Sequence, residues 1–323
     1  MNGIKSMNRR QFIGGMGGLV AVSALPALAE DDPSVFPKRG RFERLVLGYQ
    51  RVDVGATKPF SILHISDTHL TAAYPDEPKE KQQLKAARTQ CFGGRQEEAL
   101  RDSLAWARDN VDYVLHTGDL IDWQSRANLD LVKKHYGSIA LGSVGNHEYS
   151  PSMWLSSEKE TWDDRWRAKS ASLLGEAYPF DLSFSAKVVN GVNFVMLDDV
   201  FGSVSSRQVE RFSAEVKKGF PIVLCAHVPF FTDRIWQMSC RFWTRSGKKF
   251  ESAAIPPATG DFERQREDPV TRDFIAYLKS EKLLKAILAG HLHITVQDRF
   301  SPTAMEYVVG GNFMFHGEEV LFV

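Results

Sequence analysis

Six short apolar runs recur along this chain, and five of them end directly in polar residues of the types that bind metal ions. The runs are Phe60–Ile65, Tyr113–Leu115 with Val111 before it, Ile139–Val144, Val192–Leu197, Ile222–Ala226 and Ala286–Ala289. Each has the length of a β-strand and is rich in β-formers or leucine. Because ligands gather beyond the carboxyl ends of strands in α/β sheets, the sequence predicts a polar site along one sheet edge.

Helical patterns between several of these runs favour a layered α/β domain. They cover Gln96–Asn110, Ser206–Lys218 and Val270–Leu284, each with apolar residues on one face. With 43% hydrophobic and 25% charged residues, the 323-residue chain has the composition of a globular protein. Forty basic residues balance forty acidic ones, so no stable nucleic-acid partner is expected.

The polar residues that follow the five runs form a series of motifs with metal-binding character. In chain order they are D-x-H with Asp67 and His69, G-D-x-x-D with Asp119 and Asp122, G-N-H-E with Asn146 and His147, His227 before Val-Pro, and G-H-x-H with His291 and His293. Carboxylate, amide and imidazole ligands without thiolate suit Mn, Fe, Zn or Co. If the segments are extended, the two members of D-x-H and of H-x-H face the same side. Gly118, Gly145 and Gly290 are expected to let the backbone turn tightly beside the ions.

The charge of such a site favours a phosphate substrate. Two dications contribute +4, Asp67 and Asp119 contribute −2, and a bridging hydroxide leaves a net charge of about +1. Metal-bound water is acidified to a pKa of about 7, so a nucleophile exists at neutral pH without serine or cysteine. No convincing nucleophile elbow or P-loop motif competes with this interpretation.

In this order, the five motifs resemble those of the calcineurin-like metallophosphoesterase superfamily, and they span Asp67 to His293. The resemblance implies an α/β four-layer fold in which a two-sheet β-sandwich is flanked by helices. It implies two divalent or trivalent transition metal ions, Mn, Fe or Zn. The first would be held by Asp67, His69, Asp119 and His293. Asp119 would bridge to the second, which Asn146, His227 and His291 complete.

The resemblance also assigns catalytic roles to His147 and Asp122. His147 would be the general acid that protonates the leaving oxygen, and Asp122 would orient its imidazole. A non-ligand histidine beside a ligand asparagine lies within proton-transfer reach, which agrees with this role. The predicted activity is hydrolysis of a small-molecule phosphoric ester by in-line attack of a metal-bridging hydroxide.

The substrate class stays open between phosphodiesters and phosphomonoesters, with nucleotide-like substrates as one option. Protein Ser/Thr phosphatases of the superfamily carry arginines where this chain has Trp123 and Val144, and purple acid phosphatases lack the histidine that is His69 here. Both subfamilies therefore fit less well. The alternative function is a non-catalytic binding scaffold on the same fold, against which the complete set of ligand residues argues.

Two segments interrupt the alternation of strands and helices. Pro151–Gly175 has helical spacing and is predicted to form a peripheral helix. Phe230–Asp268 combines aromatic and basic residues such as Trp236 and Arg241. It is interpreted either as a lid that reads the substrate or as an amphipathic flap over the core.

Several other polar residues are expected to be structural. His64, His116 and His135 lack motif spacing, and Glu148 is expected to be a partner of nearby loops. Of the three cysteines, Cys225 lies in an apolar run and is expected in the core. A disulfide between Cys91 and Cys240 stays open.

The first 29 residues have the pattern of a twin-arginine export signal. Arg9 and Arg10 precede a short, glycine-rich apolar run, and Ala27-Leu28-Ala29 supplies a small-residue cleavage site. The predicted organisation is a signal peptide, residues 1–29, and one calcineurin-like domain, residues 30–323. Removal of the signal peptide would leave 294 residues with a net charge of −3, and we expect no membrane span in this mature chain. We expect the twin-arginine machinery to export the protein to the periplasm or beyond the cell.

Overall fold

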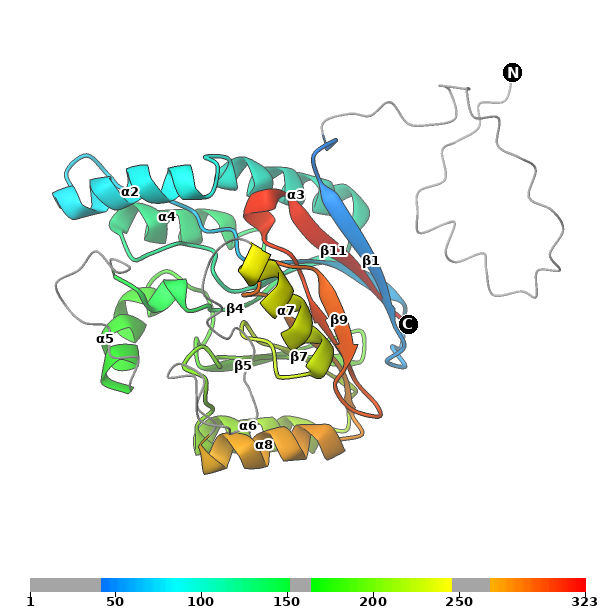
Figure 1. The fold of residues 1–323 in the computed structure, drawn as a ribbon. Coiled ribbons are helices and arrows are strands. Elements are labelled where there is room, and N and C mark those ends of the chain that lie inside the picture. Colours follow the sequence, from blue (N-terminus) through cyan, green and yellow to red (C-terminus); the bar gives the residue numbers. More distant parts are fainter. Residues whose placement is uncertain (1–41, 152–163, 246–267) are drawn as a thin grey trace, which may run out of the picture.

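The computed structural model describes residues 42–151, 164–245 and 268–323. The predicted export signal, residues 1–29, lies outside these ranges, as does the second half of Phe230–Asp268. Figure 1 shows two β-sheets enclosed between two groups of helices.

The first sheet has five strands in the order β1-β11-β2-β3-β4. They are β1 (Val46–Val52), β11 (His316–Phe322), β2 (Phe60–Ile65), β3 (Tyr113–Thr117) and β4 (Leu141–Ser143). Strands β2, β3 and β4 run parallel, so their carboxyl ends meet at one edge. Strand β11 lies between β1 and β2, parallel to the first and antiparallel to the second.

The second sheet has six strands in the order β5-β6-β7-β8-β10-β9. They are β5 (Phe184–Val189), β6 (Val192–Leu197), β7 (Ile222–Cys225), β8 (Leu284–Ala289), β10 (Met305–Val308) and β9 (Val296–Arg299). The four inner strands are parallel, and β5 and β9 add antiparallel edges. Parallel central strands again bring carboxyl ends together, here those of β7 and β8.

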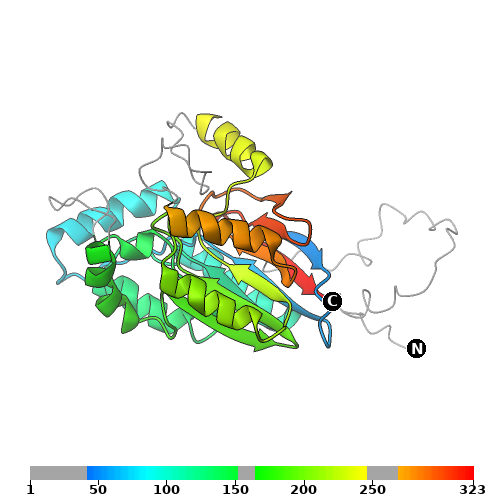
Figure 2. The same ribbon diagram turned by 90° about the horizontal axis from the view of Figure 1, so that it is seen from below.

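Apolar side chains fill three layers. The core between the sheets includes Ile62, Leu115, Val320, Phe194, Val223 and Leu288. The outer face of the first sheet packs against α3 (Gln96–Asn110) and α4 (Arg126–His135). The outer face of the second packs against α6 (Ser206–Val216) and α8 (Pro269–Ser280), which lie side by side in Figures 1 and 2. The predicted α/β four-layer fold, a two-sheet sandwich flanked by helices, is confirmed.

The remaining helices lie toward the edge that carries the polar motifs. They are α2 (Lys79–Cys91), α5 (Asp164–Gly175), α7 (Asp233–Arg245) and the short 3-10 helices η1 (His147–Tyr149) and η3 (Asn312–Met314). The helix expected within Pro151–Gly175 is confirmed in part as α5. The described part of the predicted lid contains α7, which contacts β9 at the rim of the second sheet.

Side-chain caps explain several helix starts. Ser125 accepts a hydrogen bond from the Asn128 amide at the start of α4, and Ser205 and Gln208 form a reciprocal capping box on α6. The helix predicted over Val270–Leu284 starts after the Asp268 cap but ends at Ser280, because Leu284 already belongs to β8. The sequence did not predict β1, β5, β9, β10, β11, α2 or α4.

Glu318 is an ionisable side chain on the inward face of β11, opposite Gly48 and His64 on the neighbouring strands. Burial raises its pKa to about 7, although a hydrogen bond with Gln50 partly opposes this shift. Among the described residues, its Oε2 has no hydrogen-bond partner. The fold therefore favours the protonated acid, and Glu318 destabilises the fold increasingly as the pH rises from about 4.5, its ordinary pKa, to about 7, above which the cost is constant.

We predict that Glu318→Gln stabilises the protein above pH 7 by about 1–3 kcal/mol, because the amide removes this cost. Below pH 4 the gain disappears, since the carboxyl group is protonated in both folded and unfolded states. Urea unfolding at pH 4 and pH 8 measures the difference, with the exposed Glu176→Gln as control. An equal effect of Glu318→Gln at both pH values would contradict the prediction.

Candidate metal centre

The loops that follow β2 and β3 run beside each other past the ends of their strands. The amide of Asp67 donates to the carbonyl of Gly118 at 3.0 Å, and that of His69 donates to the carbonyl of Asp119 at 2.9 Å. Leu70 continues this pairing beyond His69. Backbone hydrogen bonds alone therefore join two of the predicted motifs, D-x-H and G-D-x-x-D.

Five of the predicted ligands have a left-handed backbone. The φ angles are +54° at Asp67, +51° at His69, +54° at Asp119, +68° at His291 and +57° at His293. A positive φ is uncommon outside glycine and is held only where surrounding contacts enforce it. The expectation that D-x-H and H-x-H are extended is wrong, because these residues lie in tight turns. Their side chains still converge, but the turns rather than strand pleating direct them.

Two glycines are required by close approach rather than by turning. A Cβ atom on Gly145 would overlap with the Asp119 carboxylate, and one on Gly290 would overlap with the Ser66 hydroxyl. Gly118 differs, because its φ is +96° and a Cβ there would also meet His227. All three glycines thus lie against ligand-bearing segments, but only Gly118 has the left-handed turn conformation, so the prediction of a tight turn at all three holds for Gly118 alone.

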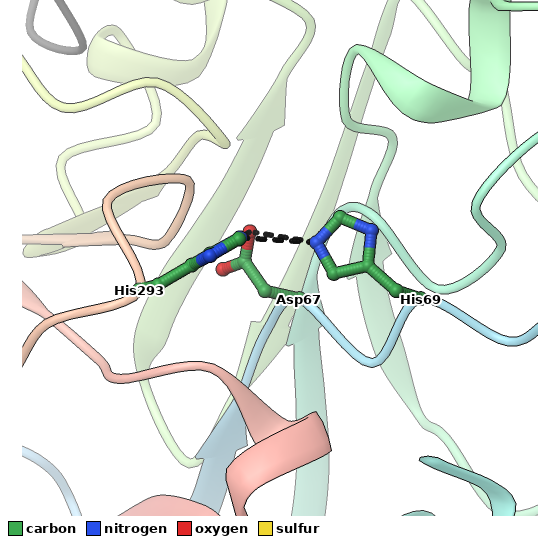
Figure 3. A group of neighbouring side chains, drawn as sticks. All are labelled: Asp67, His69 and His293. Atoms are coloured by element: carbon green, nitrogen blue, oxygen red, sulfur yellow. Dashed lines mark hydrogen bonds and ion pairs between the residues drawn. The ribbon is translucent and has the colours of Figure 1, made fainter. Parts of the chain in front are cut away.

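The first group of donors combines Asp67, His69 and His293 (Figure 3). His69 Nε2 lies 3.0 Å from His293 Nε2, and Asp67 Oδ1 lies 3.3 Å from the same atom of His293. Asp119 Oδ2 is 3.7 Å from His69 Nε2. These four residues are the predicted ligands of the first ion.

The second group lies on the other side of Asp119. His227 Nε2 is 3.3 Å from Asp119 Oδ2, 3.2 Å from Asn146 Oδ1 and 3.2 Å from His291 Nδ1. The Nδ1 of His227 faces the Thr117 carbonyl at 2.7 Å, which fixes the ring and turns Nε2 toward the site. The four predicted ligands of the second ion are thus also brought together.

The donor set fits metal ions. Two nitrogens that bind one ion about 2.1 Å away at right angles are about 3.0 Å apart, and the imidazole pairs have this spacing. In the described chain, the buried Asp67 Oδ1 lacks a hydrogen-bond donor in good geometry. Imidazole, carboxylate and amide ligands suit Mn, Fe or Zn.

The pKa values show how strongly the carboxylates attract positive charge. Burial alone would raise the pKa of Asp67 and Asp119, but neighbouring histidines outweigh burial and hold both pKa values below their usual range. Burial would lower the pKa of His227, yet Asp119 and Asp67 raise it to about 10. Burial lowers the pKa of His69 to about 4 and that of His291 to about 3. The carboxylates thus attract a proton to the centre, and cations would compete for the same place.

His147 lies at the rim of this centre, with 14% of its side chain exposed. Its Nδ1 is 2.8 Å from Asp122 Oδ1, and its Nε2 is 3.8 Å from Asp119 Oδ2. The predicted contact between Asp122 and His147 is therefore present. Asp122 also faces Nδ1 of His69 at 3.0 Å, which the sequence did not predict. His147 groups with His69 and Asp119 as well, so its geometry also permits contact with an ion.

Glu148 anchors the loops around the centre, as the sequence predicted. Its carboxylate accepts hydrogen bonds from the amides of Asp119, Leu120 and Gly145 at 2.6–2.9 Å. Tyr178 donates its hydroxyl proton to the same carboxylate at 2.8 Å. Glu148 therefore fixes the backbone of two ligand-bearing loops at once.

The other histidines do not join the clusters. His64 pairs with Thr117 and His116 with Thr68, both in buried hydrogen bonds of 2.9 Å. His135 lies in α4, 3.8 Å from Glu97. Their predicted structural roles agree with these contacts.

Outside the clusters, Trp166 of α5 is buried and donates to the Tyr149 carbonyl, which ties this peripheral helix to η1. The three cysteines, all within the described ranges, are free thiols, so the Cys91–Cys240 disulfide is not formed. Cys225 is buried in the core between the sheets, as expected.

Comparison with known proteins identifies the family. The calcineurin-like phosphoesterase model matches residues 60–295, more than half of the chain. The chain belongs to the calcineurin-like phosphoesterase family. It is therefore an enzyme of the metallophosphoesterase type, with buried histidine and aspartate clusters where this chemistry needs them.

Solved structures with a similar arrangement are distant in sequence. A dimetal phosphatase from Danio rerio is 16% identical, with a TM-score of 0.43 over 79% of this chain and 88% of that one. A purple acid phosphatase from yellow lupin seeds is 12% identical, with a TM-score of 0.47 over 79% of this chain and 44% of that one, so this chain spans less than half its length. No curated protein matches the sequence significantly.

Among the helices of the described ranges, none is both long enough and apolar enough to cross a bilayer.

We predict that Gly145→Ala abolishes metal binding and destabilises the fold by about 1–3 kcal/mol, because its Cβ would displace the Asp119 carboxylate. Gly175→Ala is the matched control, since a Cβ atom added at this exposed end of α5 has no neighbouring atom of the described residues within 4 Å. Metal content and thermal unfolding measure both effects. Normal metal content in Gly145→Ala would show that Asp119 can shift without loss of the site.

Proposed function

We propose that this enzyme hydrolyses phosphoric esters with two transition metal ions, Mn, Fe or Zn. Their ligands would be Asp67, His69, Asp119, Asn146, His227, His291 and His293. The position of Asp119 carries the proposal: its Oδ2 lies 3.3 Å from His227 Nε2 and 3.7 Å from His69 Nε2, between the two groups of donors. A carboxylate in this place suits a ligand that two ions share.

The ions, when bound, supply positive charge for the phosphate oxygens and acidify a water molecule. His147 acts on the leaving oxygen. In the metal-free protein burial would lower its pKa, but Asp119 and Asp122 outweigh burial and raise the pKa to about 9, a direction that favours the protonated ring an acid requires. Because Nδ1 faces Asp122, the proton available to a leaving group is the one on Nε2.

Phosphodiesters and nucleotide-like monoesters are the substrates we propose. Two half-buried aromatic rings border the first group of ligands. Phe313 lies with its ring centroid 5.1 Å from that of His293, and 4.8 Å from that of Phe92. Aromatic rings at this position support a substrate that carries a flat, partly apolar group.

We predict that His147→Ala keeps about two metal ions per chain but loses about 10²–10⁴-fold in kcat/KM on esters with poor leaving groups. On p-nitrophenyl phosphate and bis(p-nitrophenyl) phosphate the loss is smaller, because their leaving groups need little protonation. His135→Ala, a histidine distant from the clusters, is the control. Rates with Mn²⁺ and metal analysis measure the outcome.

Asn146→Ala is compared with His147→Ala to distinguish the effect of losing a metal ion from that of losing the general acid. Because Asn146 is a proposed ligand, its removal should lower the metal content toward one ion per chain. An unchanged rate of His147→Ala on poor leaving groups would refute its role as the acid. A wild-type protein that binds metal but turns over none of these esters would favour the binding scaffold.

We also propose that the protein is exported by the twin-arginine route and acts in the periplasm or outside the cell. The arginine pair, the short apolar run and the Ala27-Leu28-Ala29 site support this proposal.

We predict that mature protein from the exported fraction begins at Glu30. Replacement of Arg9 and Arg10 by lysine should leave the full-length chain in the cytoplasm. N-terminal sequencing and cell fractionation test this, and export of the double variant at the wild-type level would contradict the route.

A further inference from the structure

Helix α2 lies beside the metal centre but buries very little. Its buried residues are Leu84 and Arg88, which are four positions apart and therefore share one face. Leu84 packs against Trp123, and Arg88 binds Asp122. The helix is thus attached to the segment that follows the G-D-x-x-D motif through one apolar contact and one charge.

The contact between Arg88 and Asp122 is bidentate. Arg88 Nε donates to Oδ2 at 2.5 Å, and Nη2 donates to Oδ1 at 2.9 Å. The Arg88 side chain is 10% exposed and that of Asp122 is fully buried. Two parallel hydrogen bonds from a planar guanidinium fix both the position and the plane of a carboxylate.

That carboxylate serves two histidines with different tasks. Asp122 Oδ1 lies 3.0 Å from Nδ1 of His69, a proposed ligand, and 2.8 Å from Nδ1 of His147, the proposed acid. A carboxylate that rotated freely could not hold both rings, because the two contacts converge on one oxygen. The Nδ1 of His147 also forms a hydrogen bond with the backbone carbonyl of Asp122 at 3.1 Å. The orientation of His69 therefore depends on what fixes the Asp122 carboxylate, and that of His147 depends on it in part.

Phe92, the residue after α2, makes a second contact with the proposed ligand His69. The ring of Phe92 stacks on that of His69, with centroids 4.3 Å apart and 9° between the planes. The guanidinium carbon of Arg88 lies 4.8 Å from the centroid of Phe92. His69 is thus held through Asp122 at its Nδ1 edge and through Phe92 on its face.

We propose that Arg88 is a positioning residue that fixes Asp122, and through it both His69 and His147. It links the affinity for the first ion to the alignment of the acid. Because its Nε and Nη2 both face Asp122 and its side chain is nearly buried, it acts through this carboxylate rather than on the substrate. The proposal rests on the proposed function for its consequences in catalysis, but its hydrogen-bond geometry can be tested separately.

The test compares Arg88→Ala and Arg88→Lys with a matched control, Arg95→Ala. Arg95 makes the same type of bidentate pair, with Glu98 at 2.8 and 2.6 Å, and its guanidinium carbon also lies 4.8 Å from an aromatic centroid, that of Phe315. This pair is on the surface at the start of α3. It therefore controls for the general loss of an arginine pair near the first sheet.

Titration with Mn²⁺ should show an affinity for one ion that is weaker by up to about 10–100-fold in Arg88→Ala, the range expected when Asp122, the hydrogen-bond partner of the proposed ligand His69, is no longer held in place. The rate should fall most on poor leaving groups, and added guanidinium at non-denaturing concentration should restore part of both. Arg88→Lys should recover little, because an ammonium cannot hold the carboxylate plane. If Arg88→Ala matched Arg95→Ala in affinity and in leaving-group dependence, the proposal would be overturned.

Proton NMR of the metal-free protein separates this proposal from the proposed function. The Nδ1 proton of His69 should give a downfield signal that Arg88→Ala loses and guanidinium restores, and that of His147 should shift upfield in the same variant, because only its carbonyl partner remains. These signals with no metal binding or turnover in the wild type would support the positioning role and reject the proposed function. Their unchanged persistence in a folded Arg88→Ala variant would reject the positioning role whatever the activity.

Discussion

The carboxylate of Glu148 holds the loop after β3 to the loop after β4, and the geometry of the metal centre depends on this attachment. It accepts hydrogen bonds from the backbone amides of Asp119 and Gly145, so the carboxylate that we propose as the bridging ligand and the segment leading to Asn146 share one anchor. The price is a buried acid whose pKa is raised by burial and by Asp119. Four backbone amides and the Tyr178 hydroxyl, all donated to one carboxylate, offset much of that cost.

The same anchor helps to explain how five ligand residues keep a left-handed backbone. Each such residue costs about 1–3 kcal/mol, so the turns persist only where hydrogen bonds on both sides determine them. Asp67 and His69 donate to the loop of Asp119, and Asp67 accepts from Phe313 and His291. The strain is spread over loops that are attached to each other, and side chains from the ends of three strands, β2, β3 and β8, are thereby aimed at one place.

The strands that precede the motifs and the layered fold could be predicted from the sequence, because they depend on short continuous apolar runs and on residue types. The same patterns missed β11, which has two glutamates facing the interior of the fold, and α2, whose face buries only Leu84 and Arg88. The pairing of Arg88 with Asp122 joins residues 34 positions apart. No local pattern marks such a contact, and the left-handed turns at Asp67 and His69 likewise are held by tertiary hydrogen bonds rather than by propensity.

The central position of β11 has a consequence for the order of folding. This strand pairs with β2, whose end carries Asp67, and the amides of Asn312 and Phe313 donate to the carbonyls of Ser66 and Asp67. About 250 residues separate these partners, which makes the contact order of the first sheet high and its closure slow. A ribosome-bound chain cannot complete the turn that presents Asp67 until the segment beyond residue 312 has been synthesised. Under the proposed function, assembly of the ligand set around Asp67 is therefore a late event that requires β11.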